Sequence, residues 1–135
     1  MTLADILNQH RGREGPLLPI LHDVQAEFGF IGEDAIRTIA DALNLTRAEV
    51  HGVVSFYHDF RTTPDARPVV KLCRAEACQA RGVDAVAAAV PQQDGVKIET
   101  IYCLGLCSVG PAAMVGTSVH ARLDAEKLAA LVAAQ

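Results

Sequence analysis

The sequence predicts an α+β protein whose first half is a helical bundle and whose second half alternates strands and helices. Apolar residues recur at helical spacing over 1–60, and short β-branched runs alternate with helical segments over 68–135. Pro64, Pro68 and a Thr-Thr-Pro-Asp turn separate the two patterns. We therefore expect an N-terminal helical domain at 1–60, a linker at 61–67 and a second domain at 68–135.

Three apolar stripes predict the helices of the first domain. The first follows Pro16, which a first helical turn tolerates because its missing N–H would be unpaired there, and it stops at Gly29. The third begins at a capping box formed by Thr46 and Glu49. We expect the stripes to form core, and their members are Leu17, Leu21, Val24, Phe28, Ala35, Ile36, Ile39, Ala40, Leu43, Val50, Val53, Val54 and Tyr57.

The second domain is expected to follow the order β-α-β-β-β-α. An alanine-rich helix is predicted over 83–90, ended by Pro91, and Asp124 can cap a last helix. The first two predicted strands lead directly into cysteines. The strands cover residues 69–72, 96–102, 112–115 and 118–121.

Composition excludes several classes of function. The chain has 135 residues, a net charge of −4 and no tryptophan, which argues against nucleic-acid binding. No apolar run approaches the ~20 residues of a membrane span, and residues 1–15 lack the apolar core of a secretory signal. We therefore expect a cytoplasmic protein with no nucleic-acid partner and no direct membrane insertion.

Catalytic motifs are missing from the sequence. It contains no G-x-G-x-x-G after a strand and no G-x4-G-K-[ST], so it offers no nucleotide site of its own. The five histidines show no metal-ligand spacing, and no Ser/His/Asp order or carboxylate pair stands out. We expect a chain without a catalytic site.

The four cysteines are the candidate functional residues of this sequence. Cys73 and Cys78 form C-x4-C, and Cys103 and Cys107 form C-x3-C after 24 intervening residues. A cytosolic chain is kept reduced, which disfavours a disulfide framework. Each pair is expected in a loop after a strand, and two loops at one edge of a sheet can bring four sulfurs together. Four thiolates suit Zn²⁺ or an iron–sulfur cluster.

The spacing of the cysteines favours an iron–sulfur cluster, but it does not exclude zinc or free thiols. Structural zinc ribbons usually use C-x2-C knuckles, whereas these longer loops leave room for a two-iron rhomb in which each pair holds one iron. Glycines at 82, 105 and 110 would let backbone N–H groups approach the sulfurs. A zinc-stabilised interaction module remains a different hypothesis, and free redox thiols remain a third. Neither pair is the C-x-x-C of a thioredoxin-type dithiol.

Two cysteine segments and two helical segments resemble a known family. The segments LCRAEACQARG at 72–82, YCLGLCSVGP at 102–111, LLPILHDVQAEFGFI at 17–31 and LTRAEVHGVVSFYHDFR at 45–61 are similar to the thioredoxin-like [2Fe–2S] subunits of NAD-linked oxidoreductases. These include the respiratory NADH:quinone oxidoreductase, NAD-linked hydrogenases and soluble NAD-dependent formate dehydrogenases. The resemblance covers about residues 16–134.

This resemblance implies a cofactor, partners and a role. It implies one [2Fe–2S] cluster with Cys73, Cys78, Cys103 and Cys107 as ligands on a thioredoxin-like domain. A partner subunit would bind FMN and NAD(H), and the helical part would pack on it. The chain would then be a non-catalytic electron-transfer subunit, because hydride delivers electrons in pairs while a cluster moves them singly.

The loop between the first two cysteines separates the members of the family. It reads Arg-Ala-Glu-Ala here, whereas the respiratory and hydrogenase subunits more often carry a Gly-Thr segment. The present form resembles the gamma subunit of formate dehydrogenases that contain molybdenum or tungsten. We therefore expect a formate dehydrogenase as the parent enzyme, with the respiratory or hydrogenase complex as the alternative.

Overall fold

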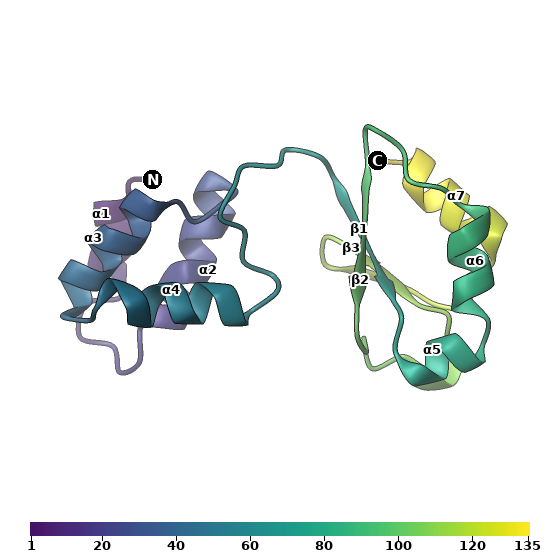
Figure 1. The fold of residues 1–135 in the computed structure, drawn as a ribbon, viewed down its shortest axis with the longest axis horizontal. Helices are drawn as coiled ribbons and strands as arrows, with labels where there is room; N and C mark the ends of the chain where they lie inside the picture. Colours follow the sequence, from purple (N-terminus) through teal and green to yellow (C-terminus); the bar gives the residue numbers. More distant parts are fainter. The chain divides into compact units, whose positions relative to one another are not determined.

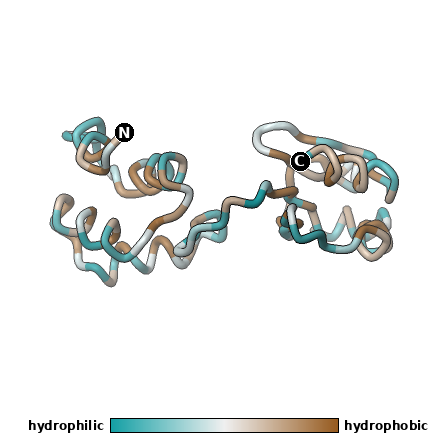
Figure 2. Tube along the Cα trace, turned by 90° about the horizontal axis from the view of Figure 1, so that it is seen from above, coloured by the Kyte–Doolittle hydropathy of each residue, from teal (hydrophilic) through white to brown (hydrophobic).

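The computed structural model describes all residues 1–135 and divides them into two compact units, Met1–Ala66 and Arg67–Gln135 (Figure 1). Each unit has its own hydrophobic core, and no residue belongs to both cores. The first unit is wholly helical, and the second contains the only sheet. Hydrophobic and hydrophilic residues intermingle along the helices of both units, as amphipathic elements require (Figure 2). The predicted α+β class is therefore confirmed.

Four helices make up the first unit. They are α1 (Leu3–Gln9), α2 (Leu17–Phe28), α3 (Glu33–Leu43) and α4 (Arg47–Phe56). Pro16 is the N-cap of α2, and Gly29 ends that helix with a φ of 81°, a conformation that glycine adopts without steric cost. The residues they bury are Ile6, Ile20, Leu21, Val24, Ile31, Ile36, Ile39, Ala40, Val50, Val54 and Phe60.

The chain after α4 remains attached to the first unit. Phe60 is buried in its core, and the N–H of Ile31 donates to the carbonyl of Arg61 at 2.7 Å. The amide of Arg61 also donates to Oε1 of Gln25 at 2.7 Å. Residues 57–61 thus extend the packing of the helices beyond the last helical turn.

The start of α4 depends on the predicted capping box. The Thr46 hydroxyl accepts from the Glu49 amide at 3.2 Å, and the Glu49 carboxylate accepts from the Thr46 amide at 2.7 Å. Thr46→Ala is expected to destabilise the first unit by about 1 kcal/mol, because it leaves a helix-terminal N–H without a partner. Thermal unfolding followed at 222 nm measures this loss. Ser55→Ala, on the exposed part of the same helix, is the control, and an equal loss there would contradict the capping role.

The second unit is built on a four-stranded sheet in the order β2-β1-β3-β4. The strands are β1 (Val69–Cys73), β2 (Lys97–Ile101), β3 (Ala113–Val115) and β4 (Ser118–His120). β1 and β2 run parallel, with Cys73 opposite Ile101, whereas β3 and β4 pair antiparallel. The parallel pair requires a crossover, which the intervening helices provide.

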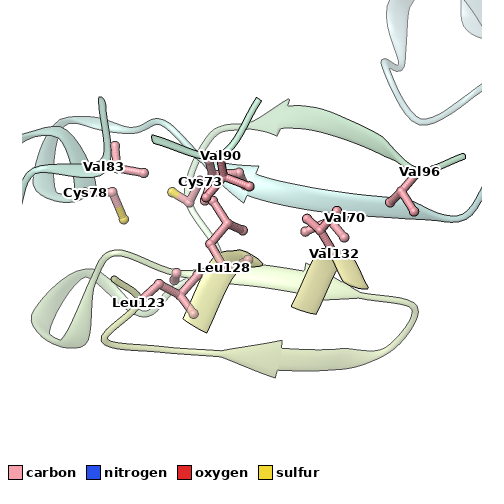
Figure 3. Packing of buried hydrophobic residues seen from close by; sticks show 12 residues of the cluster. Val70, Cys73, Cys78, Val83, Val90, Val96, Leu123, Leu128 and Val132 are labelled. Carbon is pink, nitrogen blue, oxygen red and sulfur yellow. The ribbon is translucent and has the colours of Figure 1, made fainter. Parts of the chain in front are cut away.

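Helices cover one face of this sheet. α6 (Val83–Ala89) and α7 (Ala125–Ala133) lie on the same side of the strands (Figure 1). Val70 of β1 and Leu128 and Val132 of α7 belong to one buried cluster (Figure 3). Asp124 caps α7 as predicted, accepting from the Lys127 amide at 2.8 Å. No helix of the chain combines the length and the apolar character needed to cross a bilayer.

Two short helical segments of this unit had no sequence prediction. α5 (Glu76–Ala80) follows β1, and the 3₁₀ segment η1 (Cys107–Val109) precedes β3. Both contain a cysteine, and Cys73 is the last residue of β1, so the expectation that all four cysteines lie in loops was wrong for Cys73, Cys78 and Cys107.

Candidate metal centre

Two cysteines lie at or after the end of β1, and the other two lie after the end of β2. Cys73 is the last residue of β1, and Cys78 lies on α5. Cys103 comes two residues after the end of β2, and Cys107 is the first residue of η1. Parallel neighbours end at the same edge of a sheet, so the two segments that carry the cysteines start side by side.

The four cysteines lie close to one another. The Sγ atoms of Cys103 and Cys107 are 3.6 Å apart. Two thiolates on one tetrahedral metal, with bonds of about 2.3 Å, would lie about 3.8 Å apart. Cys73 and Cys78 line the same pocket as Cys107 and are near enough to shift each other's pKa. The Cys103 amide joins the two pairs, because it donates to Cys73 Sγ at 3.3 Å.

The donor set fits a binuclear cluster of the kind that takes four thiolates. No three of the chain's histidine, cysteine, aspartate and glutamate side chains converge on one point as a single metal ion would require. Cys103 and Cys107 instead form a contacting pair, and Cys73 and Cys78 lie together beside them in one pocket. Such an arrangement would offer two thiolates to each iron of a binuclear cluster.

Burial differs sharply between the two pairs. Cys73 and Cys78 are 1% and 2% exposed, whereas Cys103 and Cys107 are both exposed. We call Cys73 and Cys78 the inner pair and Cys103 and Cys107 the outer pair. Any group held by all four sulfurs would therefore have one buried end and one end near the surface.

The backbone amide of Cys103 donates to the sulfur of Cys73 at 3.3 Å. Burial alone would raise the pKa of this thiol, but hydrogen bonds from the Ala75, Cys103 and Leu104 amides and from the Cys78 thiol outweigh it and lower the pKa overall. The thiolate is the form that binds metal ions. The fold therefore favours the charged, metal-binding state at its most buried cysteine.

The other members of each pair shift in the opposite direction. Burial raises the pKa of Cys78, and its hydrogen bond with Cys73 raises it further. The pKa of Cys107 is raised by its hydrogen bond with Cys103 and by the charge of that neighbour. Two adjacent thiolates repel each other, so each pair resists full ionisation until a cation neutralises it.

A largely apolar pocket of about 320 Å³ lies at the cysteines. Cys73, Cys78 and Cys107 line it, and Cys103 adjoins it through its contact with Cys107. Its remaining lining is mostly apolar, which restricts water at the sulfurs, and consists of Ala75, Glu76, Ala77, Leu104, Leu106 and Ala112. Leu104 and Leu106, which lie between Cys103 and Cys107 in the sequence, belong to this lining.

The glycines at 105 and 110 were expected to let backbone N–H groups approach the sulfurs, and the structure gives both a steric role. The amide that donates to Cys73 Sγ is that of Cys103. Gly105 has a φ of 75°, so it permits the turn between the outer cysteines. At Gly110 a Cβ atom would lie 3.0 Å from Cys78 Sγ, so this glycine allows the chain before β3 to pass close to the inner pair.

Gly110→Ala is expected to displace Cys78 and to reduce occupancy of the metal centre. The added methyl would meet the sulfur of Cys78 at 3.0 Å, so the sulfur must shift, whereas the Cα of Cys78 at 3.6 Å stays in ordinary contact. Overpacking of this kind costs about 1–3 kcal/mol. Metal content per chain measures the effect. Gly95→Ala, where a Cβ would meet nothing within 4 Å, is the matched control, and equal losses in both would contradict the steric explanation.

The chain is similar to a known protein family and to several characterised proteins. The family model described as thioredoxin-like [2Fe–2S] ferredoxin matches residues 3–135. The chain is 34% identical over 119 residues to the NADP-reducing hydrogenase subunit HndA of Solidesulfovibrio fructosivorans, covering 80% of this chain and 70% of that protein. It is 30% identical over 120 residues to an NADH-quinone oxidoreductase subunit of Escherichia coli (strain K12), covering 81% of this chain and 72% of that protein.

Other relatives are considerably longer than this chain. The corresponding NADH-quinone oxidoreductase subunit of Mycobacterium bovis is 32% identical over 122 residues, and the matched region spans 48% of its length. A crystal structure of an NAD⁺-reducing [NiFe]-hydrogenase in the air-oxidized state superposes with a TM-score of 0.70 at 26% identity, covering 87% of this chain and 22% of that one. With a family match over almost its full length, the chain belongs to the thioredoxin-like [2Fe–2S] ferredoxin family, and its cofactor is one [2Fe–2S] cluster.

Proposed function

We propose that this chain is an electron-transfer subunit of an NAD-linked oxidoreductase and that Cys73, Cys78, Cys103 and Cys107 hold its [2Fe–2S] cluster. The observation that carries the proposal is the pairing of the sulfurs, with a 3.6 Å contact in the outer pair and an amide that connects the two pairs. The relatives named as subunits of hydrogenase and NADH-quinone oxidoreductase complexes support the same role.

The residues around the cysteines would hold the cluster and limit its contact with water. When bound, the cluster accepts and releases one electron at a time. Amides of Ala75, Cys103 and Leu104 stabilise negative charge on Cys73. Leu104 and Leu106 line the pocket and restrict solvent. The exposed outer pair leaves a short route between the cluster and an electron donor or acceptor at the surface.

We favour a soluble, cytoplasmic NAD-dependent formate dehydrogenase, which oxidises formate to CO₂ and reduces NAD⁺ to NADH, as the parent enzyme. The support is the Arg-Ala-Glu-Ala loop between Cys73 and Cys78, which resembles the gamma subunit of those enzymes. In that complex the chain would contact an iron–sulfur subunit that binds FMN and NAD(H). A further subunit would hold molybdenum or tungsten and act on formate.

A second candidate is the equivalent subunit of an NAD(P)-linked hydrogenase or of a respiratory NADH:quinone oxidoreductase. Its support is the identity of about one third with subunits that carry those names. The two candidates share the cofactor, the ligands and the flavin-containing neighbour, and they differ in the enzyme that supplies electrons.

Iron and acid-labile sulfide per chain test the cofactor and its ligands. Anaerobically purified protein should contain about two of each, the composition of a [2Fe–2S] centre. Zinc near one per chain without sulfide would instead favour a zinc-stabilised interaction module. Free thiols titrating on all four cysteines, without metal, would favour a thiol-redox protein.

Purification of the native complex tests the parent enzyme. A tagged copy of this chain should bring down a flavin-containing subunit and a molybdenum- or tungsten-containing subunit, and the complex should reduce NAD⁺ with formate. NAD⁺ reduction with H₂ would instead identify a hydrogenase. Co-purification with quinone-reactive membrane subunits would identify the respiratory complex.

A further inference from the structure

One edge of the sheet is formed by β2, which has β1 on one side and no strand on the other. The Lys97 N–H donates towards the chain that leads into β1, and the Ile101 carbonyl accepts from the Arg74 N–H, both at 2.9 Å. Backbone groups of successive strand residues point to alternate sides of the strand. Ile98 and Thr100 therefore direct their N–H and C=O groups away from β1, where an added strand could pair with them.

The side-chain amide of Gln92 covers the outward groups of Ile98. Its Oε1 accepts from the Ile98 N–H at 3.2 Å, and its Nε2 donates to the Ile98 carbonyl at 2.8 Å. These are the two bonds that the facing residue of an antiparallel strand forms in a hydrogen-bonded pair. Gln92 is exposed and comes shortly after α6. Its side chain thus takes the place of a neighbouring strand at this position.

The start of the same edge is covered by backbone. The N–H of Val96, directly before β2, donates to the carbonyl of Gln93 at 3.4 Å and closes a tight turn over 93–96. Thr100 is exposed and is the next residue after Ile98 whose backbone faces outward. A strand added to this edge can therefore pair from residue 98 onward, and Gln92 occupies the first pairing position.

A second copy of β2 complements this edge. Antiparallel pairing about a two-fold axis at Thr100 would place Thr100 opposite its own copy and Ile98 opposite the second copy's Tyr102. Threonine pairs and pairs of an aromatic with a β-branched residue are among the favourable cross-strand pairs. Tyr102 directly follows β2 and is 72% exposed. Glu99 would face the second copy's Ile101, so no like charges stand opposite each other.

We propose that the outer edge of β2 is a pairing surface for a second copy of this chain and that the Gln92 side chain keeps this surface closed. An unpaired strand edge is a template for another chain, and a two-fold axis presents the same surface on both copies. With Gln92 in place, the chain stays available as a single subunit. Without it, two four-stranded sheets would join along β2 into one continuous sheet.

The test compares self-association of the full chain and of Gln92→Met by analytical ultracentrifugation over a range of concentrations. Methionine keeps the length of the side chain and removes both hydrogen-bonding groups. We expect a dimerisation constant at least about tenfold higher in the variant, because the uncovered groups of each copy gain hydrogen bonds to the other. Circular dichroism checks that the variant is folded. A folded variant that stays monomeric like the wild type would overturn the proposal.

Gln135→Met is the matched control. Gln135 is in the same unit and also uses its Nε2 to hold a backbone carbonyl, that of Leu131 at 3.0 Å, but it lies at the end of α7 and not on the edge of β2. It should associate no more than the wild type. Equal association of both variants would show a general effect of the methionine and would contradict the role of Gln92.

A second substitution tests which surface pairs. Thr100→Pro, added to Gln92→Met, removes an N–H that points away from β1, so it leaves the bonds to β1 in place but takes a donor from the added strand. Self-association should return to the wild-type level. Association that persists would place the contact elsewhere, for example at β4, the other edge of the sheet, and would overturn the proposal.

Hydrogen exchange of the wild-type chain tests the closed edge without any substitution. The Ile98 amide should exchange more slowly than the Thr100 amide, because Gln92 accepts a hydrogen bond from Ile98. Equal exchange of the two amides would show that Gln92 does not cover the edge, and the proposal would fail whatever the variants do. None of these measurements depends on iron or sulfide, so this failure would leave the proposed function standing.

Discussion

Cys103→Ser is expected to remove most of the cluster while the helical unit stays folded. A serine hydroxyl is a much poorer ligand for iron than a thiolate, because soft sulfur donors suit these clusters. The substitution also breaks the 3.6 Å contact with Cys107 that defines the outer pair. Iron and sulfide content should fall well below two per chain. Circular dichroism should retain the helical signal of Met1–Ala66, whose core contains no cysteine.

Ser108→Ala is the control for Cys103→Ser. Ser108 is exposed and lies in the same segment as the outer pair, on η1, but it offers no thiolate. It should retain full iron content. Unchanged iron in Cys103→Ser would refute the assignment of Cys103 as a ligand. Iron bound by a fragment limited to residues 1–60, which contains no cysteine, would show that the set of four ligands is incomplete.

Ile20→Ala is expected to have the opposite pattern, with an unstable helical unit and an intact cluster. Ile20 is fully buried in the core of the first unit. Truncating a buried isoleucine to alanine costs about 2–5 kcal/mol through lost burial and the cavity left behind. For a unit of this size the midpoint of thermal unfolding should fall by at least about 8 °C. The visible absorption of the cluster should be unchanged at room temperature.

Ile20→Val is the matched control, because it removes one methylene and should cost about 0.5–1.5 kcal/mol. Circular dichroism at 222 nm and visible absorption, recorded in the same thermal scan, separate the two units. Loss of iron in Ile20→Ala would show that the stability of the second unit depends on the first. That result would contradict the independence implied by two cores without a common residue.

Most helices and strands were predictable because each carries a local signal. The helical stripes, the capping box at Thr46 and the cap at Asp124 specified α2, α3, α4 and α7, and the β-branched runs specified the strands. α1 and α5 were not predicted. α1 begins at a capping box of Thr2 and Asp5 that the sequence analysis missed, and it buries only Ile6. α5 is five residues long and buries only Cys78. Segments this short show no periodic stripe, and packing rather than propensity forms them.

The candidate site was predictable in composition but not in detail. Spacing identified the four cysteines, and the expected β-α-β order favours parallel neighbouring strands that bring Cys73 close to Cys103. The ligand assignment stays a prediction until metal content is measured. The difference in burial between the pairs depends on where α5 packs, and the contact of Gly110 with Cys78 depends on a chain segment 32 residues away. Such long-range contacts leave no pattern in a single sequence.

The contrast in exposure between the two cysteine pairs determines how the centre would be damaged and repaired. Oxidants, chelators and competing metals arrive from solvent, so they reach Cys103 and Cys107 before the inner pair. Breakdown of a cluster held by these four cysteines should therefore begin at the iron nearer the surface. Cys73 and Cys78, protected by burial, would keep their thiols and retain the template on which a new cluster is assembled. Oxidative damage would thus be concentrated at the outer pair, while the inner pair would remain available for reassembly of the cluster.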